Sequence, residues 1–142
     1  MANLVVYYEH PLWFEPLFRG LDRRGLHWER LQTLAYIFVP ADRSAPAPVM
    51  FNRLAMSSFL RQSEHAIFHG LAAVSHWELA GARVINGSQA LHVDTSKARQ
   101  LSLFRSLGLS VPRTRVVHQF TDIPLAATLA VRIAITGIGR HG

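Results

Sequence analysis

The first apolar segment of the chain restricts its fold more than any other feature. Leu4–Tyr8 is an unbroken apolar run, rich in β-branched and aromatic side chains, and Glu9, His10 and Pro11 end it. A strand with one face in water alternates apolar and polar residues, whereas an unbroken run is typical of a strand that is covered on both faces. The chain therefore needs a sheet with a layer on each side, which is the arrangement of α/β proteins.

Strands and helices alternate over the first part of the chain. The expected helices cover about residues 16–24 and 62–80, and each is followed by a glycine, Gly25 and Gly81. The further expected strands cover residues 27–31, 49–51 and 83–85, with a proline-rich loop over 40–48. This alternation predicts a three-layer α/β domain over residues 1–88, with a four-stranded parallel sheet and right-handed crossovers.

Residues 89–142 carry a second series of helix and strand signals. Asp94 is a credible N-cap for a helix over residues 95–107, and Gly108 follows its end. Beyond it we expect a strand over 115–118, a brief helix over 123–130 capped by Asp122, and a last strand over 131–136. The sequence therefore predicts two regions, with the boundary after residue 88.

Polar residues follow the expected third and fourth strands. Because the carboxyl ends of parallel strands meet at one edge of a sheet, where α/β proteins bind their ligands, these residues are candidates for substrate binding. An arginine at such an edge suits a substrate carboxylate, since its planar guanidinium binds a carboxylate through two parallel hydrogen bonds. The candidates are Asn52, Arg53, Asn86 and Ser88.

An ordered series of short motifs joins the two regions. It consists of Asn86–Ala90, Asp94–Lys97, Leu107–Leu109 and Val111–Thr114. The series resembles the join between the pre-ATP-grasp domain and the ATP-grasp module in RimK-type ligases, glutathione synthetases and their relatives. In that family a strand ends near Asn, an acidic residue or Asn stands close before a Lys, a helix ends in Leu-Gly, and Pro-x-Thr opens a strand. The resemblance covers residues 1 to about 125, and its several fixed spacings make it more specific than a lone glycine motif.

The resemblance implies a fold, an activity and cofactors. Residues 1–88 would form a pre-ATP-grasp, Rossmann-like α/β domain, and residues 89–142 the truncated beginning of the ATP-grasp α+β module. An intact relative would use ATP and Mg²⁺ to join an amine to a carboxylate through an acyl phosphate. Lys97 matches the lysine that contacts the nucleotide phosphates in the family.

The position of Lys97 supports a phosphate contact on physical grounds as well. A cation in the first turn of a helix faces the positive end of the helix dipole, which is unfavourable by up to about 1 kcal/mol. The backbone N–H groups at that end already favour an anion, and an ammonium group beside them strengthens such a site. An exposed surface lysine, with its long side chain turned away from the dipole, is the alternative.

The later parts of the family pattern are missing from this sequence. The family continues with a strand that carries a second phosphate-contacting lysine and with a glycine-rich lid, whereas Val131–Thr136 has strand character but no lysine. Gly137, Gly139 and Gly142 give a nominal GxGxxG without a following helix. The Mg²⁺ ligands and the adenine pocket belong to a later domain in the family. We therefore expect no catalytic residue here, at most weak ATP binding, and an interrupted reading frame near Gln119 or a cut from a longer protein.

Charge and composition leave two other functions open. The formal net charge is +6, and of the 15 basic residues only Lys97 is a lysine. The arginines are spread along the chain, which favours a solvated basic surface over a dedicated nucleic-acid site, so nucleic acid is an unlikely partner. The alternatives to a ligase fragment are a stand-alone α/β interaction module without chemistry and a basic nucleic-acid-binding domain. The apolar surface of an incomplete module would also favour self-association.

The compartment and metal signals are weak. The sequence has no cysteine, no signal-peptide pattern and no apolar run near the ~20 residues of a membrane span, so we expect a cytoplasmic protein. His65, His69 and His76 could share one face of the long helix, and such a face can bind Zn²⁺. A surface stripe of histidines is the more common explanation, and we assign no metal ligand.

Overall fold

The computed structural model describes residues 1–60, 65–124 and 132–135 of the chain. The chain divides into two compact units, Met1–Leu91 and His92–Gly142. The sequence places its boundary after residue 88, inside the short helix α3, Ser88–Asp94, whose first residues belong to the first unit. No helix in the described part of the chain combines the length and apolar character that a bilayer-crossing segment requires.

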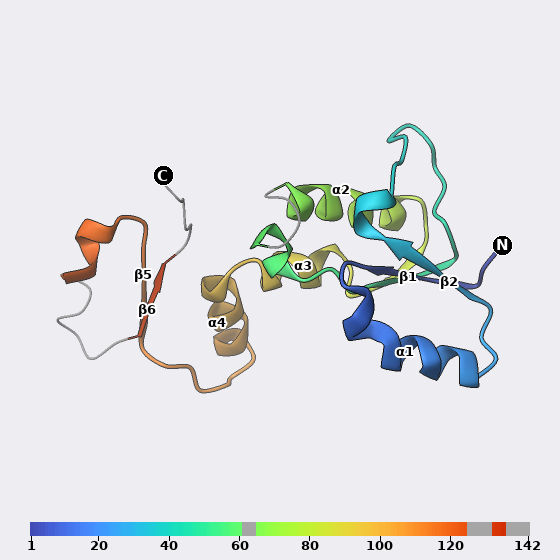
Figure 1. Cartoon of the computed structure of the whole chain (residues 1–142). Helices are drawn as coiled ribbons and strands as arrows, with labels where there is room; N and C mark the ends of the chain where they lie inside the picture. Colours follow the sequence, from blue (N-terminus) through green and yellow to red (C-terminus); the bar gives the residue numbers. More distant parts are fainter. Residues whose placement is uncertain (61–64, 125–131, 136–142) are drawn as a thin grey trace. The chain divides into compact units, whose positions relative to one another are not determined.

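The first unit contains the predicted four-stranded parallel sheet (Figure 1). Its strands are paired in the order β2-β1-β3-β4, and every pairing is parallel. The strands are β1 (Leu4–Tyr8), β2 (Trp28–Gln32), β3 (Val49–Asn52) and β4 (Arg83–Ile85). The α/β fold class is confirmed.

The sheet lies between two helices, α1 (Pro11–Arg23) and α2 (Ala66–Leu79), as Figure 1 shows. Successive side chains of a strand point to opposite faces. Val6 and Tyr8 therefore pack with Phe18 of α1, while Val5 and Tyr7 pack with Trp77 of α2. The strand is covered on both faces, as its unbroken apolar sequence predicts.

Helix α1 begins earlier than the sequence predicts. We expect its start near Pro16, because proline is favoured in the first turn. The helix instead begins at Pro11, directly after His10, and Pro16 lies inside it. A proline there removes one backbone hydrogen bond. The packing of Phe14, Leu17 and Leu21 against the cluster around Phe18 stabilises the longer helix.

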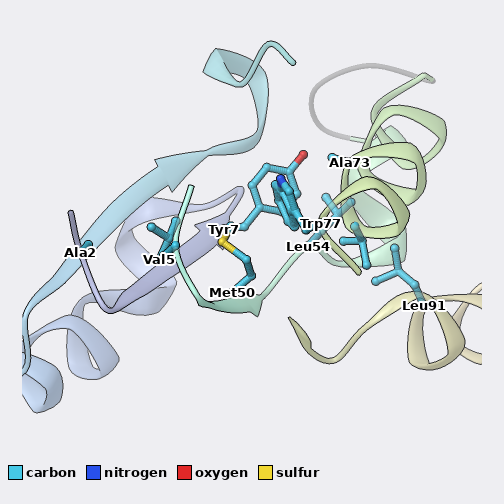
Figure 2. Packing of buried hydrophobic residues seen from close by; sticks show 10 residues of the cluster. Ala2, Val5, Tyr7, Met50, Leu54, Ala73, Trp77 and Leu91 are labelled. Carbon is cyan, nitrogen blue, oxygen red and sulfur yellow. The ribbon is translucent and has the colours of Figure 1, made fainter. Parts of the chain in front are cut away.

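The connection from β2 to β3 contains only a short 3-10 turn, η1 (Thr33–Ala35), and then runs without regular structure over the α2 side of the sheet. Its Tyr36 hydroxyl accepts a hydrogen bond from the indole Nε1 of Trp77 at 2.8 Å. The rings of Tyr7 and Trp77 meet edge to face with centroids 4.9 Å apart, and Figure 2 shows the two side chains against each other. These aromatic contacts connect the crossover, the sheet and α2.

Helix α2 approaches the chain that follows β3 closely at one residue. A Cβ atom added to Gly70 would collide with the side chain of Leu54. The predicted helix begins at residue 62, but residues 61–64 lie outside the described part, and the described helix begins at Ala66. The predicted stop is confirmed, since Gly81 has a φ of 88°, a left-handed conformation that glycine adopts without steric cost.

The second unit contains α4 (Lys97–Ser106) and two paired parallel strands, β5 (Thr114–Val117) and β6 (Arg132–Ile135). The predicted cap of α4 is wrong: Asp94 ends α3, and Ser96 is the N-cap, with its Oγ accepting from the Arg99 N–H at 3.4 Å. Asp122 lies in a 3-10 turn, and the helix predicted after it falls mostly outside the described residues.

Candidate functional site

The carboxyl ends of β1, β3 and β4 lie at the same edge of the sheet because the strands are parallel. Tyr7 is paired with Asn52, and the next backbone N–H, that of Arg53, donates to the Tyr7 carbonyl at 2.8 Å. Four of the predicted site residues belong to this edge or to the turns that follow it: Asn52, Arg53, Asn86 and Ser88. The structure therefore brings four of the five predicted site residues into one unit.

Asn52 and Asn86 bind each other. The Asn52 side chain is 1% exposed, and its Nδ2 donates to the Asn86 carbonyl at 2.9 Å while its Oδ1 accepts from the Leu54 N–H at 3.0 Å. The Asn86 Nδ2 donates to the Asn52 carbonyl at 3.2 Å. The Asn52 amide is therefore used within the fold, where it fixes the turns after β3 and β4.

Ser88 lies at the first turn of α3 and is held through its backbone. Its N–H donates to Oε1 of Glu78, on α2, at 2.9 Å. The side chain of Glu78 thereby supplies an acceptor to an N–H group at the beginning of α3, which has no partner within the helix. Sequence reasoning missed Glu78, because the residue that caps this helix comes from ten residues earlier in the chain.

Arg53 is the exposed cation of this edge. Its guanidinium carbon lies 5.2 Å from the centroid of the Phe14 ring and 5.5 Å from that of Phe51. Within the described residues no acceptor binds the guanidinium N–H groups of Arg53. Stacking against ring faces leaves the edge of a guanidinium accessible, and that edge is the part that binds a carboxylate through two hydrogen bonds.

Of the two rings that contact Arg53, Phe14 lies at the beginning of α1, where further aromatic side chains pack against one another. His10 precedes the helix, and its ring stacks on that of Trp13 with centroids 4.5 Å apart and an interplanar angle of 13°. Phe14 follows and also contacts Tyr8. From the sequence, Trp13 and Phe14 are interpreted as core or interface aromatics. With a helix start at Pro11, His10 is the N-cap and stands three residues before Trp13, a spacing at which side chains lie near each other.

Lys97 is the first residue of α4, in the second unit, so its predicted place in a first helical turn is confirmed. Its ammonium donates to Oε1 of Gln100 at 2.9 Å, and the Gln100 amide donates to Oδ1 of Asp94 at 3.4 Å. Gln100 therefore holds the lysine beside the helix N-terminus. No acidic residue occupies the first turn, and Arg99 adds a second cation there.

No three His, Asp or Glu side chains among the described residues are placed so that they could hold a metal ion. This applies to His65, His69 and His76, all of which are described. The His69 and His76 rings lie 5.9 Å and 4.8 Å from that of Phe38, so they take part in the aromatic packing around the crossover.

Solved structures of the ATP-grasp ligase PsnB are similar to this chain. With PsnB complexed with a minimal precursor the TM-score is 0.58 at 23% identity, over 80% of this chain and 45% of that chain. With PsnB complexed with precursor peptide PsnA2 and AMPPNP it is 0.56 at 21% identity, over 79% of this chain and 46% of that chain. With PsnB complexed with minimal precursor, Mg and ADP it is also 0.56.

The fold of this chain is similar to that of part of the ATP-grasp ligase PsnB. The chain spans less than half the length of the PsnB structures that it matches. No protein-family model matches the sequence, and no curated protein matches it.

Proposed function

We propose that this chain carries the N-terminal α/β domain and the opening of the ATP-grasp module of a RimK-like carboxylate–amine ligase. The observation that carries the proposal is the agreement of two independent features. The fold matches that of an ATP-grasp ligase, and the ordered motifs of the sequence place Lys97 at the beginning of α4.

The reaction of such a ligase has two steps. A substrate carboxylate attacks the γ-phosphorus of ATP, ADP leaves, and an acyl phosphate forms. The amine then attacks the acyl carbon, phosphate leaves, and the amine loses a proton. Negative charge builds on the transferred phosphoryl group, so cations placed around it stabilise the transition state.

Within this reaction Lys97 would contact the nucleotide phosphates. Its position in the first turn of α4, where backbone N–H groups point outward, favours an anion. Among the described residues, Gln100 accepts one ammonium N–H, which leaves two donors for phosphate oxygens. PsnB was solved with AMPPNP and with Mg and ADP, which supports ATP and Mg²⁺ as the cofactors. The proposal assigns no Mg²⁺ ligand to the described residues.

Arg53 would bind the substrate carboxylate at the edge of the sheet. Phe14 and Phe51 support the guanidinium, and its N–H groups have no acceptor in the described part of the chain. Asn52, Asn86 and Ser88 would contribute by shaping the turns beside it, through the hydrogen bonds that Asn52 and Asn86 exchange. PsnB was solved with a precursor peptide, which supports a carboxylate carried by a peptide.

Nucleotide-dependent thermal stabilisation tests the proposal. We expect AMPPNP with Mg²⁺ to raise the melting temperature of the native chain in a saturable way, because ligand binding to the folded state stabilises it. Lys97→Ala should abolish the rise. Arg115→Ala, which removes an exposed cation of the same unit, should keep it.

The two alternatives give different results in the same experiment. An interaction module without chemistry shows no nucleotide response in any variant. A nucleic-acid-binding domain responds to DNA or RNA with an affinity that falls steeply with salt. Equal nucleotide responses in the native chain and Lys97→Ala would remove Lys97 from the site.

A further inference from the structure

The second unit contains a groove that the proposed nucleotide site does not use. It lies between α4 and the segment that leads into β5, and its volume is about 610 Å³. This volume is within the range of small-molecule sites, about 300–1,000 Å³. Its apolar surface comes from Leu101 on α4 and from Val111, Pro112 and Val116 on the opposite side.

The sequence periodicity explains which side chains line the groove. Leu101 and Arg105 are four residues apart on α4, so they lie on the same helix face. Thr114 and Val116 are two residues apart on β5, so they share one face of the strand. Lys97 is not among the residues that line the groove.

Arg105 is the only charged residue among the described residues that line the groove. No described residue accepts a hydrogen bond from its guanidinium or forms an ion pair with it. Two of the three hydroxyls in the lining donate elsewhere: Ser106 Oγ donates to the Leu103 carbonyl at 2.7 Å, and Thr114 Oγ1 to the Pro112 carbonyl at 3.0 Å. The described part of the groove therefore presents one cation without a partner beside an apolar surface.

We propose that this groove binds an aliphatic carboxylate, with the carboxylate on Arg105 and a branched hydrocarbon group against Leu101, Val111 and Val116. Charge complementarity selects this occupant. A guanidinium binds a carboxylate through two parallel charge-assisted hydrogen bonds. Burial of the adjacent apolar surface by a hydrocarbon group is favourable because it removes that surface from water. Such a carboxylate occurs at the C-terminus of a peptide that ends in leucine or valine, and in a free branched-chain acid. The proposal does not rest on the ligase function.

Methyl and arginine NMR spectra of the full chain test the proposal. The probes are N-acetyl-Val-Leu with a free carboxylate, the same peptide as its C-terminal amide, and 4-methylpentanoate. We expect saturable shifts of the Leu101, Val111 and Val116 methyl signals and of Arg105 Nε with both carboxylates. A stronger response to the dipeptide identifies a peptide end as the source, and a stronger response to 4-methylpentanoate identifies the free acid. The amide should cause no saturable shift.

Two variants separate binding from folding. Arg105→Gln should weaken carboxylate binding at least about tenfold, because a guanidinium–carboxylate pair is among the stronger hydrogen-bonded contacts. Arg83→Gln removes the same charge from β4 in the first unit and should leave binding unchanged. The spectrum of Arg105→Gln without probe shows whether the second unit remains folded. Arg105→Lys keeps the charge but lacks the planar guanidinium, so it should bind the carboxylates with intermediate affinity.

Three results would overturn the proposal. Equal shifts with the carboxylate and the amide would show apolar adsorption alone. Unchanged binding in Arg105→Gln, with the variant folded, would show that Arg105 serves only the end of α4. Groove signals that change with protein concentration in the absence of a probe would show that a second copy of the chain occupies the groove.

Discussion

Asn52 and Asn86 exchange hydrogen bonds across the ends of β3 and β4: each side-chain amide donates to the backbone carbonyl of the other residue, at 2.9 Å and 3.2 Å. Both lie one residue beyond the last pair of the ladder between β3 and β4, Phe51 with Ile85, while Asn52 still pairs with Tyr7 of β1. The pair therefore continues the alignment of β3 and β4 into their turns.

Asn52→Ala should lower the free energy of unfolding by about 2–3 kcal/mol, because it leaves the buried Leu54 N–H and the partly buried Asn86 carbonyl without partners. Asn86→Gly should cost only about 1 kcal/mol, since glycine tolerates the φ of 55° at that residue. Asn86→Ala should cost about 1–2 kcal/mol more than Asn86→Gly. Urea unfolding followed by Trp fluorescence measures all three, and a smaller loss for Asn52→Ala than for Asn86→Gly would contradict this account.

Tyr36→Phe should destabilise the first unit by about 1–2 kcal/mol, because the buried Trp77 indole N–H loses its acceptor. The ring contacts with Tyr7 and Phe38 remain in the variant. Thermal unfolding gives the loss of stability, and fluorescence of the native state reports the environment of the indole. Tyr8→Phe, on the other face of the sheet, is the matched control. An equal effect of the two changes would show that the loss of stability does not come from the hydrogen bond between Tyr36 and Trp77.

Tyr7 should make the protein less stable at alkaline pH. Burial, with a smaller effect of the neighbouring Tyr36, raises the pKa of Tyr7 above its ordinary value of 10.0. The unfolded chain releases the hydroxyl proton of Tyr7 at about pH 10, while the folded chain retains it. Unfolding is therefore increasingly favoured as the pH rises above that point. Below it, the contribution of Tyr7 does not change with pH.

Tyr7→Phe tests this pH dependence. The hydroxyl of Tyr7 is buried and has no hydrogen-bond partner among the described residues. Its removal should therefore raise stability by roughly 1 kcal/mol at neutral pH and reduce the alkaline loss. Melting temperatures at several pH values from about 8 to about 11 compare the two proteins. Parallel curves would show that Tyr7 does not titrate on unfolding.

Phe14 and Arg53 should be energetically coupled. A double-mutant cycle with Phe14→Leu and Arg53→Ala should give about 0.5–1 kcal/mol, the usual value of an exposed cation–π contact. Arg83 lies at the amino end of β4, and the cycle of Arg83→Ala with Phe14→Leu should give no coupling. If Arg53 binds a carboxylate, Phe14→Leu should also weaken that binding, because the guanidinium loses a support. Coupling in the Arg83 cycle would show that Phe14→Leu perturbs the whole sheet.

Local signals were enough to predict the sheet. Leu4–Tyr8 is covered on both faces, and β4 has the predicted bounds. Gly25 and Gly81, with φ of 62° and 88°, confirm both predicted helix stops. These predictions succeed because hydrophobic runs and left-handed glycines act over only a few residues.

Features that depend on distant residues could not be predicted. Helix α3 is absent from the sequence-based description because its first turn depends on Glu78, a residue of α2. Tertiary packing around Phe18 extends α1 over Pro16 against the local rule. The side-chain amide of Asn52 is recognisable from sequence only as a polar group at a strand end, and its partner is 34 residues away. The sequence also predicts Lys97 in a first helical turn, but with Asp94 as the N-cap, whereas Ser96 is the N-cap in the structure.

The close approach of Gly70 to Leu54 has a consequence for sequence divergence. Because a Cβ at residue 70 would meet a terminal methyl group of Leu54, a larger residue there requires the leucine side chain to shift or a smaller residue at position 54. The two positions lie on different elements, and we expect an increase in side-chain volume at one to be accompanied by a decrease at the other. Among homologous chains, alanine or serine at the position of Gly70 should therefore coincide with alanine, valine or glycine at the position of Leu54, and a bulky residue at both should be selected against.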